Sequence, residues 1–422
     1  MTSEVLLMNQ EAVVLAADSA VSNPIFHVND VDKFFVVSQD PPIAAMFYNA
    51  VQFGGVGWSI LFGRFARMIE GRNLTVDEVA DGFLAFLEQV GDDPYFGVDK
   101  AAELEAFNEY VALFLAQLVS ILQRIGWVPG RLPVDVIIME ALSLLEDDIL
   151  SGRRAGGRDD DPLSEEDAPA PEFFDFLEQN FEQALRSGIA YVCYEFEIDP
   201  RALDLSGSAI FEITRLMVIS CMVDWVPAGY ASLSAGLVFA GFHPGSPFPV
   251  AREFRVFPSF GGLTKVTDRR RHAISSEFDS TAVIRTFAQT ETLDSFLHKV
   301  SFRNRRRIAN ELKYYASLMR RSASARSARM SAAAAAEIDT IFAGMIRNMS
   351  DVIDSALPRK SLNLRNTLSS IRNASPQRLS ELARKSMQMI VHGEELASND
   401  TVGRPVKFLV LSRDGISSDL WE

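Results

Sequence analysis

Three residues near the start of the chain have side chains that could cleave an amide bond together. They are Thr2, Asp18 and Lys33. A threonine at a mature N-terminus carries its own base, because an α-amine with a pKa of about 7.7–8.0 can accept the hydroxyl proton at neutral pH. That amine needs a nearby cation to lower its proton affinity, and the cation needs an anion beside it. Threonine, aspartate and lysine are common residues, so only their positions in the chain can indicate a catalytic role.

Four short strands are expected to carry these residues. The runs EVLLMN (from Glu4) and AVVLAADSAV (from Ala12) flank a polar turn at Gln10–Glu11 and predict a hairpin of buried strands. The runs KFFVVS and IAAMFY follow on either side of QDPP, a strong turn signal. Asp18 would then close the second strand, and Lys33 would open the third.

Helices are expected next. Residues 57–72 show apolar spacing typical of a helix, and Thr75 with Glu78 forms a capping-box pattern before another. The helical pattern continues from Asp92 to about Val226. Within it, residues 151–171 are rich in Gly, Pro and Asp and predict a flexible linker. The candidate helices of this stretch are residues 100–125, 134–150, 172–197 and 209–226.

Strands return after the helices. The runs AGLVFAGF, EFRVFPS and LTKVTD, which begin at Ala235, Glu253 and Leu263, predict a meander. Helices are expected again from about Thr290 to His392, and KFLVLS (from Lys407) is the core of a last strand. Strand groups that alternate with helix pairs favour two sheets between helical layers.

The stretch from Thr2 to Lys33 resembles the opening of proteasome β-subunits and their bacterial relatives, which are N-terminal nucleophile (Ntn) hydrolases. In that family a catalytic threonine is followed sixteen residues later by an aspartate within an Ala-Ala-Asp-Ser motif, and Ala16 to Ser19 reads the same with the same spacing. The lysine comes one residue earlier than is usual. Two later segments, from Ala235 and from Val402, resemble later strands of the family.

The resemblance implies roles for five residues. Thr2, freed by removal of Met1, would be the nucleophile, Lys33 would lower the pKa of its amine, and Asp18 would orient Lys33. Asn49 stands where the family has a glycine whose N–H stabilises the oxyanion, and asparagine tolerates unusual φ better than most residues. Asp400, or less favourably Asn399, takes the place of the aspartate that helps orient the nucleophile. The family's Ser-Gly-Ser segment falls by order near residues 288–290, and its role stays open.

The resemblance also implies an α+β fold, a four-layer αββα sandwich of two antiparallel sheets between helical layers, with a large helical insertion. The expected parts are residues 1–90 as the first part of the core, 91–230 as the insertion, 231–300 as the second part, 301–395 as a helical region, and 396–422 as the last core strand and tail. The family's core is about half this length, so the insertion carries what is specific to this chain.

The composition argues against several classes of binding partner and cofactor. The net charge of −15 argues against nucleic-acid binding, because a phosphate backbone needs a basic surface. Cys193, Cys221 and the five histidines lack metal-ligand spacing, so neither a metal nor another cofactor is expected. The apolar stretches 110–127 and 209–242 contain polar or charged residues and favour core helices over membrane spans. The start lacks the features of a secretory signal, and we expect a cytoplasmic protein.

Two hypotheses about function remain. The first is a threonine-type peptidase or amidohydrolase, which acts on a peptide or another amide. The second is a catalytically inactive scaffold whose helical insertion mediates assembly or partner binding; Asp18 and Lys33 would then be a structural ion pair, and Met1 would be retained. The family commonly forms rings, so the resemblance implies a homo-oligomer. The sequence identifies no ATPase partner.

Overall fold

The computed structural model describes residues 3–19, 21–22, 27–28, 31–90, 100–129, 134, 137–155, 170–243, 245–276, 281–288, 291–298, 362–396 and 405–421. The chain divides into two compact units. The first comprises Met1–Val31 and Ile274–Glu422, and the second comprises Asp32–Ala273. Each unit is described by itself.

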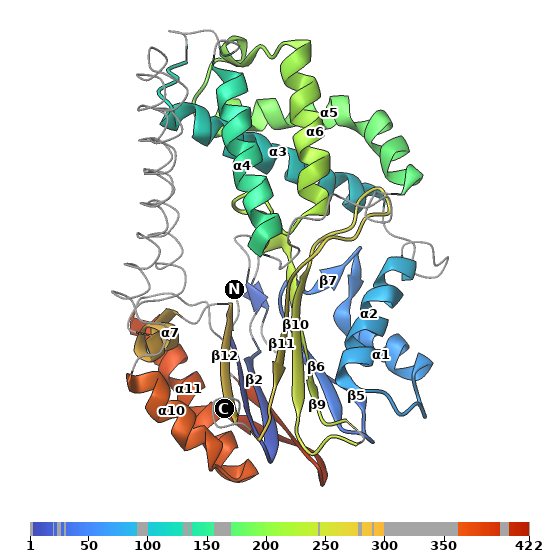
Figure 1. The fold of residues 1–422 in the computed structure, drawn as a ribbon, viewed down its shortest axis with the longest axis vertical. Helices are drawn as coiled ribbons and strands as arrows, with labels where there is room; N and C mark the ends of the chain where they lie inside the picture. Colours follow the sequence, from blue (N-terminus) through green and yellow to red (C-terminus); the bar gives the residue numbers. More distant parts are fainter. Residues whose placement is uncertain are drawn as a thin grey trace, which may run out of the picture. The chain divides into compact units, whose positions relative to one another are not determined.

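The first unit is built on a five-stranded antiparallel sheet with the order β12-β1-β2-β13-β14. Helices α10 and α11 pack on this sheet, and α7 packs against both helices (Figure 1). The strands are β1 (Ser3–Asn9), β2 (Ala12–Asp18), β12 (Ala282–Ala288), β13 (Val406–Ser412) and β14 (Gly415–Trp421). The helices are α7 (Glu291–His298), α10 (Leu362–Arg372) and α11 (Pro376–Leu396).

Alternation along the strands gives this sheet an apolar face for the helices. Every second residue of β1 and β2 belongs to the same buried cluster as the helices, as expected for a strand whose side chains point alternately to opposite faces. Helix α11 contributes residues at helical spacing, among them Leu379, Ala383 and Met387. The amide of Asn9, in the β1–β2 turn, donates to the carbonyl oxygens of Ile371 (2.8 Å) and Ala374 (2.7 Å), so it fastens the hairpin to the end of α10.

The second unit contains a five-stranded antiparallel sheet with the order β11-β10-β9-β6-β5. Helix α1 packs on β5, and α2 packs on β9 and β10. The strands are β5 (Phe34–Ser38), β6 (Ile43–Asn49), β9 (Ala235–Gly241), β10 (Val250–Val256) and β11 (Val266–Ala273); the helices are α1 (Trp58–Met68) and α2 (Val76–Val90). Aromatic rings fill the space between them, and Phe62 and Phe83 stack with centroids 4.6 Å apart. Two short ribbons, β3 (Val21–Ser22) with β4 (His27–Val28) and β7 (Gln52–Phe53) with β8 (Val56–Gly57), complete the strands of the described residues.

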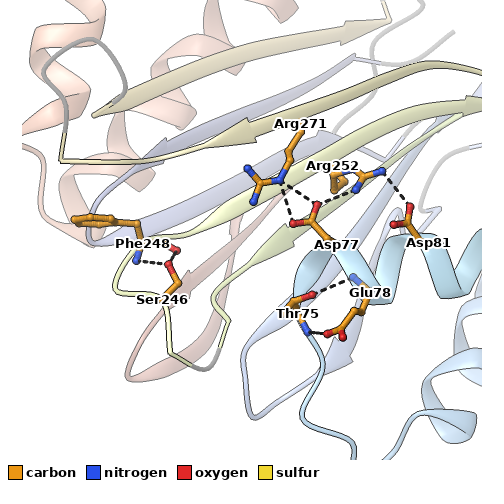
Figure 2. Close-up of polar contacts among 8 residues, drawn as sticks. All are labelled: Thr75, Asp77, Glu78, Asp81, Ser246, Phe248, Arg252 and Arg271. Carbon is orange, nitrogen blue, oxygen red and sulfur yellow. Dashed lines mark hydrogen bonds and ion pairs between the residues drawn. The ribbon is translucent and has the colours of Figure 1, made fainter. Parts of the chain in front are cut away.

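Helix α2 is fixed at its start by a capping box and is held to the sheet by ion pairs (Figure 2). The predicted capping box is present: Glu78 N–H donates to Thr75 Oγ1 (3.1 Å), and Thr75 N–H donates to Glu78 Oε2 (2.8 Å). Asp77 accepts hydrogen bonds from Arg252 of β10 (2.8 Å) and Arg271 of β11 (3.0 Å). Burial opposes ionisation of Asp77, but the two guanidinium groups outweigh it and lower the pKa of the carboxyl group. These pairs hold the helix on the sheet.

A helical layer completes the second unit. Its members are α3 (Lys100–Arg124), α4 (Ile138–Ala155), α5 (Pro171–Glu195), the 3₁₀ helix η3 (Pro200–Leu203), α6 (Gly207–Met222) and the 3₁₀ helix η4 (Tyr230–Leu233). They share one large apolar cluster, and Phe257 and Phe260 from the β10–β11 connection lie within it. This connection therefore belongs to the packing of the helical layer as much as to the sheet.

Helix α3 is, among the described residues, the one helix long and apolar enough to pass for a membrane span by length and composition. Half of its apolar window is buried. Phe107, Phe114 and Leu122 on this helix belong to the apolar cluster of the helical layer. The packing is that of a core helix, as the sequence predicts.

The predicted fold class is confirmed as α+β, with antiparallel sheets and packed helices. Strands β12 and β14 were not predicted, and neither were the two-residue strands β4, β7 and β8. Helix α4 continues to Ala155, so it extends into the segment predicted to be a flexible linker; residues 156–169 of that segment lie outside the described residues. Most of the helical region predicted for residues 301–395 also lies outside them, and its described part is helical.

Candidate active site

Asp18 lies next to the start of β1. The Ser3 N–H donates to Asp18 Oδ1 at 3.0 Å, and both residues are fully buried. The sheet register explains this contact, because Glu4 pairs with Ala17 and the next residues along the two strands are therefore adjacent. The carboxylate thus lies beside the residue that directly follows Thr2, the predicted nucleophile. Thr2 itself lies outside the described residues.

The end of β12 lies on the other side of β1. Ala288 pairs with Ser3 in the β1–β12 register and has φ of +57°, a left-handed conformation that is uncommon for alanine. Helix α7 begins at Glu291, and Thr286 Oγ1 donates to Asp294 Oδ1 (2.5 Å), which fastens this helix to β12. The open Ser-Gly-Ser position, predicted near residues 288–290, therefore begins at a backbone turn opposite Ser3. Gln289 and Thr290 lie outside the described residues.

Ser19, which follows Asp18, is held by both of its backbone groups. Its N–H donates to Pro405 O (3.1 Å), and its carbonyl oxygen accepts from Val31 N–H (3.0 Å). The side-chain hydroxyl is buried and has no hydrogen-bond partner among the described residues. The bond to Val31 closes the segment after Asp18 into a loop, and Lys33 follows two positions later in the sequence.

In the second unit, Lys33 and Asn49 lie at the same end of the sheet. Lys33 is 1% exposed, and its carbonyl oxygen accepts from Phe47 N–H (3.2 Å) on the β5 side of β6. Ala50 N–H instead donates to Ser234 O (3.4 Å), on the β9 side. Because N–H groups along a strand point alternately to the two neighbours, the N–H of Asn49 faces the same side as that of Phe47. The backbone donor of Asn49 is thus directed to the side of β6 that carries Lys33.

Asn49 ends β6 in the left-handed conformation, with φ of +67°. Asparagine adopts this conformation more readily than most residues other than glycine. The residues that follow are braced: Trp58 Nε1 donates to Ala50 O (2.9 Å), and Trp58 N–H donates to Val51 O (3.3 Å). The turn at the predicted oxyanion position is therefore a fixed structure.

Asp400, the alternative Asn399, and Thr2 cannot be placed, because all three lie outside the described residues. Among the residues that the structure describes, no three His, Cys, Asp or Glu side chains gather as metal ligands would. Of the predicted site residues that the structure describes, Asp18 lies in the first unit, and Lys33 and Asn49 lie in the second.

Comparisons with known proteins do not identify a family for this chain. No known family model matches the sequence, and no curated protein gives a significant match. Two solved structures of Anbu from Hyphomicrobium sp. strain MC1, one of them a Gly-1 mutant, align with 100% of this chain and with 87–88% of their own length. Both have a TM-score of 0.29 and 10% sequence identity. A likeness at this level carries no argument, so the proposals below depend on the residues of this chain.

Sequence reasoning missed a buried polar cluster in the helical layer. Lys265 is 8% exposed, and its ammonium group donates to the carbonyl oxygens of Ser220 (2.6 Å), Cys221 (3.3 Å) and Val223 (2.5 Å), where α6 ends. Burial lowers the pKa of Lys265 to about 8, although the charges of Cys221 and Asp224 act in the opposite direction.

Two buried tyrosines adjoin this cluster. The hydroxyl groups of Tyr110 and Ser220 are 2.5 Å apart, and the ring of Tyr110 meets the ring of Tyr230 edge-on with centroids 4.9 Å apart. Burial raises the pKa values of Tyr110, Tyr230 and Cys221. The cluster could not be predicted from the sequence, because Lys265 is a single lysine before a strand and its partners come from distant parts of the chain.

Proposed function

We propose that the chain is an N-terminal threonine hydrolase of the proteasome-like Ntn type, which cleaves a peptide or another amide. The observation that carries the proposal is the hydrogen bond from Ser3 N–H to the buried Asp18 carboxylate. It supports a placement of Asp18 next to Thr2, as the sixteen-residue spacing and the Ala-Ala-Asp-Ser motif imply. The role of Lys33 in the proposal comes from the same resemblance.

The reaction would proceed in two steps. After removal of Met1, Thr2 Oγ1 attacks the amide carbonyl carbon while the α-amine takes the hydroxyl proton. Lys33 keeps that amine neutral, Asp18 orients Lys33, and the N–H of Asn49 stabilises the oxyanion. The tetrahedral intermediate collapses with transfer of the proton to the leaving amine, which forms an ester on Thr2. Water, with the α-amine again as base, then hydrolyses the ester. Asp400 would help to orient the nucleophile.

The decisive experiment combines intact-mass and N-terminal analysis with an electrophile that acylates threonine. The protein as natively expressed should begin at Thr2 and gain one adduct on that residue after exposure to a peptide β-lactone. Thr2→Ser should keep the adduct because it keeps a hydroxyl nucleophile, and Thr2→Ala should lose it. Retention of Met1 on most molecules, without an adduct, would overturn the proposal.

The alternative function is a catalytically inactive scaffold that binds a partner through its helical layer. One observation favours it: Asn49 brings a side chain to the predicted oxyanion turn, where the family has glycine. The same mass experiment separates the two functions, because a scaffold would not form the Thr2 adduct.

We also propose that the chain is cytoplasmic and assembles with copies of itself. Size-exclusion chromatography with light scattering would test the assembly, and a monomer at all accessible concentrations would contradict it. The protein substrate and any ATPase partner would be sought only after an adduct on Thr2 had been obtained.

A further inference from the structure

The turn that follows β6 is held from the helical layer as well as from α1. Ser234 is fully buried, and its carbonyl oxygen accepts the N–H of Ala50, one residue after Asn49. Asn49 itself pairs with Ala235 across the β6–β9 ladder. Residues 234 and 235 therefore set the position of the chain at the predicted oxyanion donor.

Ser234 is the residue at which η4 ends. Its side-chain hydroxyl donates to Ala231 O (2.7 Å), and its N–H donates to the same oxygen (3.4 Å), so the last turn of η4 fixes its conformation. Helix η4 begins after Gly229, which has φ of +91°, a conformation that favours glycine. A displacement of η4 would move Ser234 and, through its carbonyl oxygen, the Asn49–Ala50 turn.

Tyr230 anchors η4 in the helical layer. Its ring is fully buried, stacks on Phe257 with centroids 5.4 Å apart, and meets Tyr110 of α3 edge-on. Its hydroxyl has no hydrogen-bond partner among the described residues, so the ring contacts hold it. Each such aromatic pair contributes about 0.5–1.5 kcal/mol beyond the burial of its area. A continuous set of packed groups thus runs from α3 through Tyr230 and Ser234 to Asn49.

We propose that Ser234 is a positioning residue for the oxyanion donor at Asn49, and that the helical layer controls this donor through Tyr230 and η4. The inference rests on the proposed hydrolase function and assigns a role in it to the helical insertion. A partner that binds the helical layer and displaces η4 would thereby change the reaction rate at Thr2. The expected size follows from mutagenesis of oxyanion donors, where complete loss of one donor lowers rates about 100- to 1,000-fold. A displaced donor should therefore lower the reaction rate about tenfold.

The test uses Tyr230→Leu, which removes both ring contacts, with Tyr230→Phe as the matched control that keeps the ring and loses only the unpartnered hydroxyl. Ser234→Ala is a milder second variant, because it loses one hydrogen bond and leaves the backbone carbonyl in place. Each variant is treated with two probes. A peptide β-lactone reacts through a tetrahedral oxyanion, whereas a vinyl sulfone on the same peptide adds Thr2 Oγ1 to carbon without an oxyanion at that position.

We expect Tyr230→Leu to lower the ratio of lactone to vinyl sulfone labelling rates about tenfold, Ser234→Ala to lower it by a smaller factor, and Tyr230→Phe to leave it within twofold. Equal losses with both probes would mean general disruption of the site and would overturn the positioning role. An unchanged ratio in both Tyr230→Leu and Ser234→Ala would also overturn it.

A readout independent of activity separates this inference from the proposed function. In ¹⁵N-asparagine-labelled protein, the amide resonance of Asn49, assigned by its loss in Asn49→Asp, should shift in Tyr230→Leu and stay in place in Tyr230→Phe. If the parent reacts with neither probe, the hydrolase function fails, and with it the assigned catalytic role. If the Asn49 resonance is the same in the parent and in Tyr230→Leu, the coupling itself is absent.

Discussion

The buried ammonium group of Lys265 should make the stability of the second unit depend on pH in an unusual direction. Its pKa is about 8 in the folded protein, against an ordinary value of 10.5 for lysine. Between these values the unfolded chain binds more protons than the folded chain, so the free energy of unfolding rises with pH. Below pH 8 both states are protonated, and the fold bears the full cost of the buried charge. Above pH 10.5 both are neutral, and this cost is gone.

The magnitude follows from the width of this window. Each pH unit between the two pKa values changes the free energy of unfolding by about 1.4 kcal/mol, so a change from pH 8 to pH 9.5 should add about 2 kcal/mol. Cys221 acts in the opposite direction near pH 9, because burial raises the pKa of its thiol above the ordinary value of 9.0 and the thiol therefore ionises first in the unfolded chain. Burial likewise raises the pKa values of Tyr110 and Tyr230, whose ordinary value of 10.0 lies above this range. A comparison with a variant that lacks only the lysine charge isolates the contribution of Lys265.

The assay is urea unfolding of the parent and of Lys265→Met at half-unit steps from pH 7 to 9.5, followed by circular dichroism. Methionine keeps the length of the side chain and removes the charge. The difference in unfolding free energy between parent and variant should change by about 2 kcal/mol in favour of the parent as the pH rises. Parallel curves would show that Lys265 does not titrate in this window, which is the result expected if the α6 carbonyl oxygens outweigh burial, and they would refute the reasoning.

Three further predictions concern other positions. Asp18→Asn should lower amide hydrolysis about 100-fold or more while the fold persists, because the asparagine oxygen can still accept from Ser3 N–H; steady-state rates and circular dichroism would check both, and an active variant would refute the role of the carboxylate. Thr75→Ala should cost about 1 kcal/mol in urea unfolding by loss of the cap, and Glu78→Gln, which keeps the reciprocal bond, should cost less; equal losses would argue against the capping box. Gly236→Ala should cost at least about 3 kcal/mol, because its Cβ would lie 1.8 Å from Cζ of Tyr48; a thermal melt within two degrees of the parent would contradict the packing of that ring.

The sequence predicts most of the sheets because their central strands are apolar on both faces. Strands β1, β2 and β9 are buried along their whole length, and each forms an unbroken apolar run that is easy to recognise. The two longer strands that were missed, β12 and β14, lie at the edges of the first sheet. Their residues are partly exposed and polar side chains interrupt them, so neither alternation nor composition marks them clearly.

Of the candidate site, only the position of Asp18 beside the start of β1 follows from a local sequence pattern. The register of Asp18 against Ser3 follows from a tight hairpin, which sequence spacing fixes. The roles of Ser234 and Lys265 could not be predicted, because each depends on contacts between segments far apart in the sequence. Ala288 was considered only because its order in the chain matches that of the family's Ser-Gly-Ser segment. Its left-handed backbone conformation depends on the turn in which it lies.

The position of β13 has a consequence for how the protein is made. Asp18 lies on β2, which pairs on one side with β1 and on the other with β13, where Val406 is opposite Asp18 and Pro405 O accepts from Ser19 N–H. An isolated two-stranded hairpin is at best marginally stable in water. A nascent chain therefore holds β2 without β13 until residues 406–412 have been synthesised. A nucleophile next to this hairpin would stay inactive until then, since the sheet that positions it closes only once β13 has been made.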